Sequence, residues 1–271
     1  MNFTFLNEAV PGGRLHGMEI GEGDDLAVHL HGTWGNFYEN PFVVALADTY
    51  TAAGWRYASV NLPSHDGGSI DETLDDSIEA LRAWIDRLGR PGSRVILQGH
   101  SLGALKVIRA LHDRALRGAP VTVAAAVLLA PFDIVAFNGG STRLDVENNR
   151  AAVRDLVVSE TDTLVPKMIF PHWPLSARTY LDITEPGGRW DVFPSRNGDE
   201  HSRWVAGCGV RTFVAVGGDD FAAFPDAIQV VDGLKDLPGV SSHVIPEAPH
   251  NFAGQEAELQ DRLGGFLARL A

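Results

Sequence analysis

Three short segments of the chain carry the residue types that acyl transfer through a serine requires. The first is Gly99-His100-Ser101-Leu102-Gly103, which follows an apolar run at 95–97 and opens a helical pattern over 102–116. A serine at such a strand-to-helix turn has a strained backbone and close neighbours, so the flanking positions must be glycine. The turn lifts the hydroxyl clear of the sheet, beside the free N–H groups of the helix N-terminus. We therefore predict that Ser101 is a nucleophile.

The second segment supplies a general base near the end of the chain. His250 lies in Pro249-His250-Asn251-Phe252, after a predicted strand at 243–245 and before a predicted helix at 256–270. A histidine in that loop can lean over the carboxyl edge of a sheet, take the serine proton and return it to the leaving group. Its position therefore predicts His250, among the ten histidines, as the base.

The third segment supplies a carboxylate that would accept the Nδ1 hydrogen of the histidine. Asp219 and Asp220 follow the predicted strand 211–216 in Gly217-Gly218-Asp219-Asp220, and only one of them can face His250. Asp133, after the predicted strand 121–129, is an outside candidate for this acid, but its position fits a helix N-cap better. Glu247 is close to His250 in sequence, but it fits a charged loop residue better than the acid. The residues alone leave Asp219 and Asp220 open.

A glycine-containing loop early in the chain is suited to complete an oxyanion hole. His31-Gly32-Thr33-Trp34-Gly35-Asn36 follows the predicted strand 26–31, and its glycines let the backbone pass close to the serine. The N–H of Thr33 or Trp34 can then pair with the N–H of Leu102 around the oxyanion.

The elements that must position these segments alternate between apolar strands and amphipathic helices. The predicted strands are 26–31, 56–62, 94–98, 121–129, 211–216 and 243–245, and several are apolar throughout. Such strands are covered on both faces, so we predict an α/β fold with a mostly parallel central sheet and helices on both faces. The segments 3–7 and 14–20 predict an antiparallel hairpin at the sheet edge.

The clearest predicted helix spans residues 70–88. Its apolar residues recur at spacings of three and four, which places them in one stripe. Ser69 and Glu72 fit a capping box at its start, and Gly89 followed by Pro91 fits its end.

One stretch breaks the alternation. Between about 138 and 208 the apolar spacing is irregular, prolines are scattered and no clear strand appears, which is too long for a simple loop. We predict a helical lid at 138–180, inserted between a first core part, 1–137, and a second, 181–271, of one structural domain.

Composition excludes several classes of partner. The 271 residues carry a formal charge of −13, which disfavours nucleic acid and anionic membranes. No basic and apolar leader and no 18-residue apolar run appear, and the single Cys208 allows no internal disulfide, so we expect a cytoplasmic protein. His29 and His31 merely share a strand face, so we expect no metal, and no cofactor is implied.

Together these motifs resemble the α/β-hydrolase superfamily over nearly the whole chain, above all its single-domain esterases with a lid after the sixth strand. Residues 31–33 match the oxyanion loop, 99–103 the nucleophile elbow and 249–252 the histidine loop, usually Gly-His-x-Phe. Residues 217–220 match a G-x-x-D segment whose last Asp is the acid, so the resemblance implies Asp220. The match of 61–67 to an Asp-x-x-Gly-His-Gly loop is partial, because Asn61 and Ser64 replace the first Asp and the first Gly.

The resemblance implies a Ser–His–Asp mechanism but no particular substrate. The leading hypothesis is hydrolysis of a small-molecule carboxylic ester through an acyl-enzyme on Ser101, with the N–H groups of Thr33 and Leu102 as the oxyanion hole. Thioester hydrolysis or acyl transfer with the same residues is one alternative. A catalytically silent binding protein on the hydrolase fold is another, and the oligomeric state stays open.

Aromatic residues near these segments are candidates for a substrate pocket. The candidates are Trp34, Phe37 and Tyr38 beside the oxyanion loop, His100 in the elbow and Trp173 in the lid. Phe170 and Tyr180 suit a pocket and a lid core equally well. His65 and Asp66 fit a polar loop better than a pocket rim.

Overall fold

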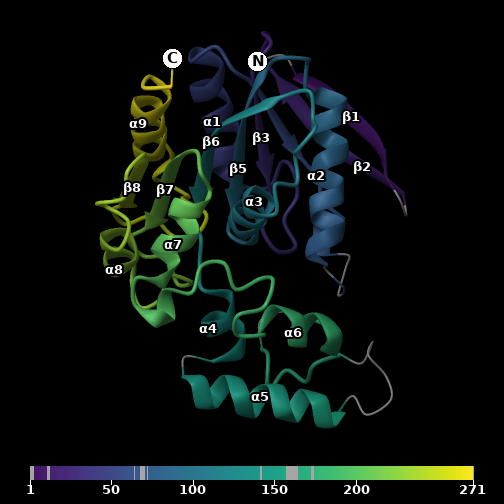
Figure 1. Cartoon of the computed structure of the whole chain (residues 1–271), viewed down its shortest axis with the longest axis vertical. Helices are drawn as coiled ribbons and strands as arrows, with labels where there is room; N and C mark the ends of the chain where they lie inside the picture. The colour runs from purple at the N-terminus through teal and green to yellow at the C-terminus, as the bar shows by residue number, and fades with distance from the viewer. Residues whose placement is uncertain are drawn as a thin grey trace.

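The strands form one eight-stranded sheet in the computed structural model, and helices connect many of them (Figure 1). The structure describes residues 3–10, 13–63, 65–67, 71, 73–140, 142–156, 164–171 and 174–270. The strands are β1 (Phe3–Val10), β2 (Gly13–Ile20), β3 (Leu26–Leu30), β4 (Arg56–Val60), β5 (Arg94–His100), β6 (Thr122–Leu129), β7 (Arg211–Gly217) and β8 (Val240–Ile245).

The sheet order is β1-β2-β4-β3-β5-β6-β7-β8. β1 pairs antiparallel with β2 and β2 antiparallel with β4, whereas the pairs from β4 to β8 are parallel. The predicted mostly parallel sheet and its edge hairpin are therefore confirmed. Because the central strands run parallel, the loops that follow β3, β5, β6, β7 and β8 all leave the same edge of the sheet.

Two apolar layers cover the two faces of the sheet, which explains why the central strands are apolar throughout. On one face α1 (Pro41–Ala52) packs against α9 (Glu256–Leu267), with Phe42, Tyr50 and Phe266 in their shared core. On the other face α2 (Leu74–Leu88) and α3 (Leu102–His112) bury Trp84 and Leu105. The predicted helices on both faces are therefore confirmed.

The start of α2 differs from the sequence prediction. The helix begins at Leu74, where Thr73 is the N-cap and its hydroxyl accepts a hydrogen bond from the Asp76 N–H at 3.1 Å. The predicted start at residue 70 is therefore wrong, because Thr73 is the N-cap and the helix begins directly after it. Ser69 and Glu72, the predicted capping box, lie outside the described residues. The predicted end is confirmed, with Gly89 as the C-cap.

The chain between β6 and β7 supplies most of the remaining helices. These are α4 (Ile134–Gly139), α5 (Arg143–Leu156), α6 (Ala177–Ile183), the short η2 (Ser195–Asn197) and α7 (Glu200–Gly207), while η1 (His65–Gly67) and α8 (Ala227–Asp232) follow β4 and β7. Figure 1 shows α4, α5 and α6 beyond the end of the sheet, and α7 beside β7. The helical segment thus projects past the carboxyl edge of the strands, and the boundaries of a lid within it stay a prediction.

A buried ion-pair cluster joins the two ends of this segment. The fully buried Asp133 carboxylate accepts from the Ala136 N–H at 2.9 Å, which makes it the N-cap of α4 and confirms that interpretation. The guanidinium of Arg196 binds Asp133 at 2.5 Å and also pairs with Asp191. Burial raises the pKa of the Asp133 carboxyl, and the charge of Arg196 opposes that rise. The cluster therefore ties the chain leaving the sheet to the chain returning to it.

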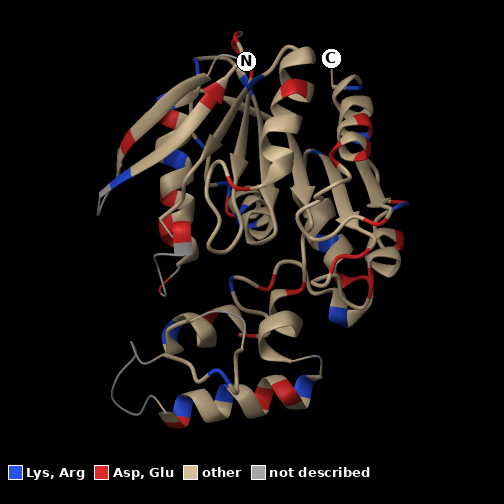
Figure 2. Ribbon diagram, turned by 180° about the vertical axis from the view of Figure 1, so that it is seen from behind, with Lys and Arg blue, Asp and Glu red and all other residues tan. Residues whose placement is uncertain are grey.

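Charged residues are interspersed over the outer helices. Figure 2 shows the positions of acidic and basic residues mixed along α5. None of the described helices is both long and apolar enough to cross a membrane.

The turn between β5 and α3 depends on two close backbone contacts. A Cβ atom on Gly99 would lie 2.2 Å from the carbonyl oxygen of Gly103, and one on Gly103 would lie 2.2 Å from that of Leu30. Both obstacles are backbone atoms, which cannot rotate away. The glycines of the predicted elbow are thus required by packing between β3, β5 and α3.

We expect Gly99→Ala to lower the free energy of unfolding by more than about 3 kcal/mol, because the new methyl group must displace backbone. Urea unfolding at 25 °C measures the change. Gly264→Ala in α9 is the matched control, since its nearest outside atom is 3.8 Å away and a helical alanine is favoured by about 1 kcal/mol. Equal stability of the two variants would contradict the packing argument.

Candidate active site

Ser101 lies at the turn from β5 into α3 with a backbone that few serines adopt. Its φ is 56° and its ψ is −123°, in the region that normally favours glycine. The Ser101 N–H is fixed to the carbonyl of Leu129 at 2.8 Å, so β6 holds the turn in place. Strain of this kind persists only where the surroundings enforce it, and it sets the direction of the hydroxyl.

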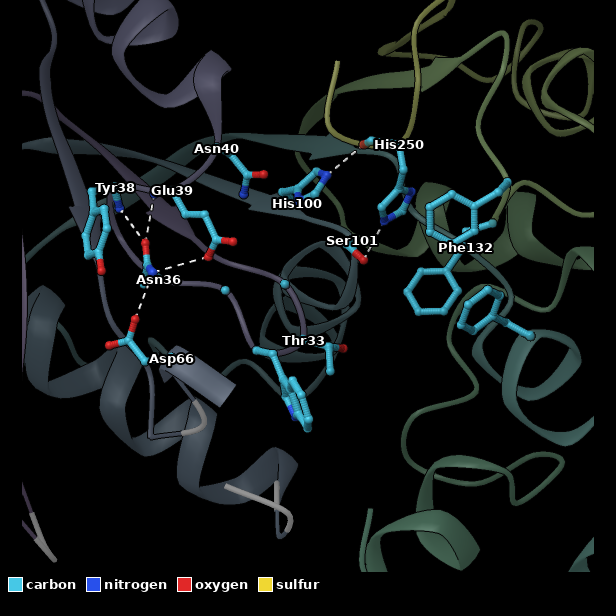
Figure 3. A pocket seen from close by; sticks show the side chains of 16 residues that line it. Thr33, Asn36, Tyr38, Glu39, Asn40, Asp66, His100, Ser101, Phe132 and His250 are labelled. Carbon is cyan, nitrogen blue, oxygen red and sulfur yellow. Dashed lines mark hydrogen bonds between the residues drawn. The ribbon is translucent and has the colours of Figure 1, made fainter. Parts of the chain in front are cut away.

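A hydrogen-bonded chain joins Ser101 to His250 and Asp220. The His250 Nε2 lies 2.8 Å from the Ser101 Oγ (Figure 3). The His250 Nδ1 lies 2.8 Å from the Asp220 Oδ1. A carboxylate only accepts, so the Nδ1–H donates to Asp220 and leaves Nε2 free to accept from the serine hydroxyl. The structure thus brings together the three residues that the sequence predicts, from the ends of β5, β7 and β8.

Burial and contacts distinguish the four carboxylates that are candidates for the partner of His250. The Asp220 side chain is buried, and its Oδ1 also accepts from the Ala222 N–H at 2.8 Å, which holds it toward His250. Asp219 and Glu247 are exposed. Asp133 is engaged at the start of α4. Of these candidates, Asp220 is the one that contacts His250.

The loop after β3 packs directly against Ser101. A Cβ atom on Gly32 would lie 2.8 Å from the Ser101 Cβ, so glycine is needed there. His31 holds the loop, since its Nδ1–H donates to the Gly32 carbonyl at 2.7 Å and its Nε2 accepts from the Leu62 N–H at 2.9 Å. Thr33 lines the cavity at Ser101, and Leu102 is the first residue of α3. Both predicted oxyanion-hole residues therefore flank the serine.

His100 lines the cavity and also contacts His250. Its Nε2–H donates to the backbone carbonyl of His250 at 2.8 Å, and its ring lies 5.0 Å from those of both Phe42 and His250. Burial, and secondarily the nearby His250, lowers the pKa of His100 to about 3. A neutral His100 with its proton on Nε2 thus secures the loop that carries His250.

A cavity of about 760 Å³ opens at Ser101 and His250. Of the predicted pocket residues, Trp34, Tyr38 and His100 lie in its lining. Phe37 lies outside the described lining, because Asn61 binds its backbone N–H at 2.9 Å and its ring packs on Phe5 and Tyr38. Trp173 lies outside the described residues. Phe170 and Tyr180 are both buried, with ring centroids 5.9 Å apart, and belong to the core of the inserted segment.

Sequence reasoning missed seven residues of the cavity wall, which are Asn36, Glu39, Asn40, Phe132, Phe137, Phe221 and Ala222. Asp66 also lines the cavity, so the preference for a plain polar loop at Asp66 is wrong. Each of these residues lies in the loop or the helix that follows a parallel strand. That position was the available signal, because all such segments meet at one edge of the sheet.

Comparisons with known proteins place the chain in a family. The model of the alpha/beta hydrolase family matches residues 27–261, and the chain belongs to that family. A search of curated proteins gives no significant sequence match.

Many solved structures share the fold. Est1E from Butyrivibrio proteoclasticus, solved with ferulic acid bound, is 15% identical with a TM-score of 0.67, and the match covers 98% of each chain. The siderophore hydrolase EstB from Aspergillus fumigatus is 18% identical with a TM-score of 0.67, over 100% of this chain and 98% of that one. A hydrolase described as putative, from Agrobacterium vitis S4, is 14% identical with a TM-score of 0.69, over 98% of each.

We expect acid to destabilise the fold between pH 6.5 and 5 through its buried histidines. Burial lowers the pKa of His29, and burial with Lys106 nearby lowers that of His31 to about 3, as burial does for His100. The unfolded chain therefore binds protons below about pH 6.5 that the folded chain rejects, so stability is full above that pH and is lost as the pH falls toward 3.

Urea unfolding at a series of pH values measures this loss, at up to about 1.4 kcal/mol per pH unit for each such histidine. His31→Gln should reduce the slope of the free energy of unfolding against pH by the amount that corresponds to about one proton. A slope that is flat across this window would contradict the neutral, buried state of these rings.

Proposed function

We propose that this protein is a serine hydrolase that cleaves carboxylic esters of small molecules through an acyl-enzyme on Ser101. The observation that carries the proposal is the continuous hydrogen-bonded chain from the Ser101 Oγ through His250 to the buried Asp220 carboxylate. Membership of the alpha/beta hydrolase family supports hydrolytic chemistry at this site.

The arrangement supports a two-step acyl transfer. His250 Nε2 takes the proton of Ser101 as the Oγ attacks the ester carbonyl, and Asp220 stabilises the resulting imidazolium at Nδ1. The N–H groups of Thr33 and Leu102 hold the oxyanion of the tetrahedral intermediate. His250 then gives its proton to the leaving alcohol, and a water, activated in the same way, releases the acid and restores Ser101.

We expect a fluorophosphonate to label Ser101 in the wild-type protein and to leave Ser101→Ala unlabelled. Mass spectrometry of the adduct locates the site, and hydrolysis of short-chain nitrophenyl esters measures turnover in parallel. His250→Ala should lower kcat by at least about a thousandfold, since the serine loses its base. Asp219→Asn, which changes the neighbouring exposed carboxylate, is the matched control for Asp220→Asn and should keep its activity.

The outcomes separate the alternatives. Labelling of Ser101 without ester turnover would favour thioester cleavage or acyl transfer in place of ester hydrolysis. No adduct in folded protein would overturn the proposal and favour a binding protein on this fold.

We also expect His100→Leu to lower kcat about tenfold with little change in KM, because the loop that carries His250 loses its N–H donor. His100→Gln, whose amide can still donate, should recover part of the loss. The rate of fluorophosphonate labelling should fall in parallel with kcat. A rise in KM alone would show instead that His100 contacts the substrate.

A further inference from the structure

The cavity has two chemically different halves on opposite sides of Ser101 (Figure 3). One half is aromatic and surrounds His250, with ring centroids of Phe132 and Phe221 at 6.3 and 5.0 Å from that of His250. Phe137 extends this half, 5.4 Å from Phe132. The other half is polar and consists of Asn36, Tyr38, Glu39, Asn40 and Asp66. A substrate that fills the cavity must therefore match both surfaces.

The buried amide of Asn36 organises the polar half. Its Oδ1 accepts from the backbone N–H groups of Tyr38 at 3.0 Å and Glu39 at 2.8 Å. Its Nδ2 donates to the carboxylates of Asp66 at 2.8 Å and Glu39 at 3.2 Å. All four hydrogen-bonding positions of the amide are thus occupied, so one rigid side chain holds two carboxylates together at the cavity wall.

The negative charge of Glu39 and Asp66 is not offset by a lysine or arginine among the described residues that line the cavity. The second oxygen of Asp66 accepts from the Nδ1 of His65 at 2.6 Å. Partial burial would raise the pKa of Asp66, but the hydrogen bonds from His65 and Asn36 hold it below its usual value, so the carboxylate is charged at neutral pH. Tyr38, 59% exposed, adds an accessible ring face that also attracts cations.

The position of His250 assigns the two halves to the two parts of an ester. His250 must protonate the leaving oxygen, so the alcohol lies on the His250 side, against the phenylalanines. The acyl chain then extends the other way, past Thr33 toward Asn36. A hydroxyl group would offer the paired carboxylates only a dipole, whereas an ammonium group offers a full charge at a site that already carries two negative ones.

We propose that the preferred substrates are esters of an aromatic or apolar alcohol whose acyl chain carries a cationic, ammonium-type group bound by Glu39 and Asp66. This inference rests on the proposed function, since it names the substrate class of the same site. It assigns Glu39 and Asp66 as specificity-determining residues and Asn36 as the residue that positions them.

The test uses three nitrophenyl esters, the first two of which differ in charge alone. The acyl groups of these two are 4-(trimethylammonio)butanoyl and its neutral isostere 5,5-dimethylhexanoyl, and each rate is divided by the uncatalysed hydrolysis rate of the same ester. We expect kcat/KM for the cationic ester to exceed that for the isostere by at least about tenfold, the combined size of charge–charge attraction to the carboxylates and a cation–π contact with Tyr38. The anionic 4-carboxybutanoyl ester should be the poorest substrate. The preference should shrink as NaCl rises to about 0.5 M, because Glu39 is exposed to screening.

Substitutions then tie the preference to the two carboxylates. In Glu39→Gln/Asp66→Asn we expect the ratio of cationic to neutral kcat/KM to fall toward one. Asp86→Asn, which removes an exposed carboxylate of α2 that lies outside the cavity lining, is the matched control and should keep the ratio. Fluorophosphonate labelling of Ser101 in each variant shows that the site has folded.

Failure of the inference is distinguishable from failure of the proposed function. Turnover of all three esters with a ratio near one, or an unchanged ratio in the double variant, would overturn the cationic preference and leave the serine hydrolase intact. Absence of labelling and of turnover for every ester in the wild-type protein would overturn the proposed function itself.

Discussion

The close packing of backbone against backbone at the β5–α3 turn is the constraint on which the candidate site depends. A Cβ atom on Gly99 would clash with the carbonyl of Gly103, one on Gly103 with that of Leu30, and one on Gly32 with Ser101 itself. Three segments of the chain therefore meet at van der Waals distance without side chains between them. This arrangement brings the loop after β3 next to the serine, and the same contacts hold Ser101 at its positive φ.

A second close approach fixes the other two members of the hydrogen-bonded chain. A Cβ atom on Gly217 would lie 2.3 Å from the Ala248 carbonyl oxygen, and the Asp219 N–H donates to that same carbonyl at 3.0 Å. The loops after β7 and β8 thus bind each other before either reaches the serine. The separation of Asp220 and His250 is thus set by one backbone contact shared by two adjacent loops rather than by long flexible side chains.

The parts that could be predicted from the sequence are those encoded by local pattern. The strands, the elbow around Ser101 and the loop of His250 each follow from a few neighbouring residues. The choice of Asp220 over Asp219 could not be made this way, because both share one loop and only the tertiary contact with His250 separates them. The prediction of where α2 starts failed for a local reason, since Thr73 caps the helix in place of a plausible earlier cap.

The phenylalanines of the cavity could not be predicted, because Phe132, Phe137 and Phe221 come from the segments after β6 and β7, which only the sheet brings together.

The division of the cavity follows from the same architecture. The residues that would perform the chemistry stand on turns locked by glycine contacts, whereas the polar wall stands on the loop from Asn36 to Asn40, organised by one amide, and the aromatic wall on loops after β6 and β7. Exchange of Glu39 would alter the polar wall without moving the hydrogen bonds of His250, whereas Phe221 packs against the His250 ring at 5.0 Å. The hydrogen bonds of Asn36 that hold the polar wall involve no side chain of the Ser101–His250–Asp220 chain. The selectivity of the polar wall can therefore vary among proteins of this fold while the serine, histidine and aspartate keep their geometry.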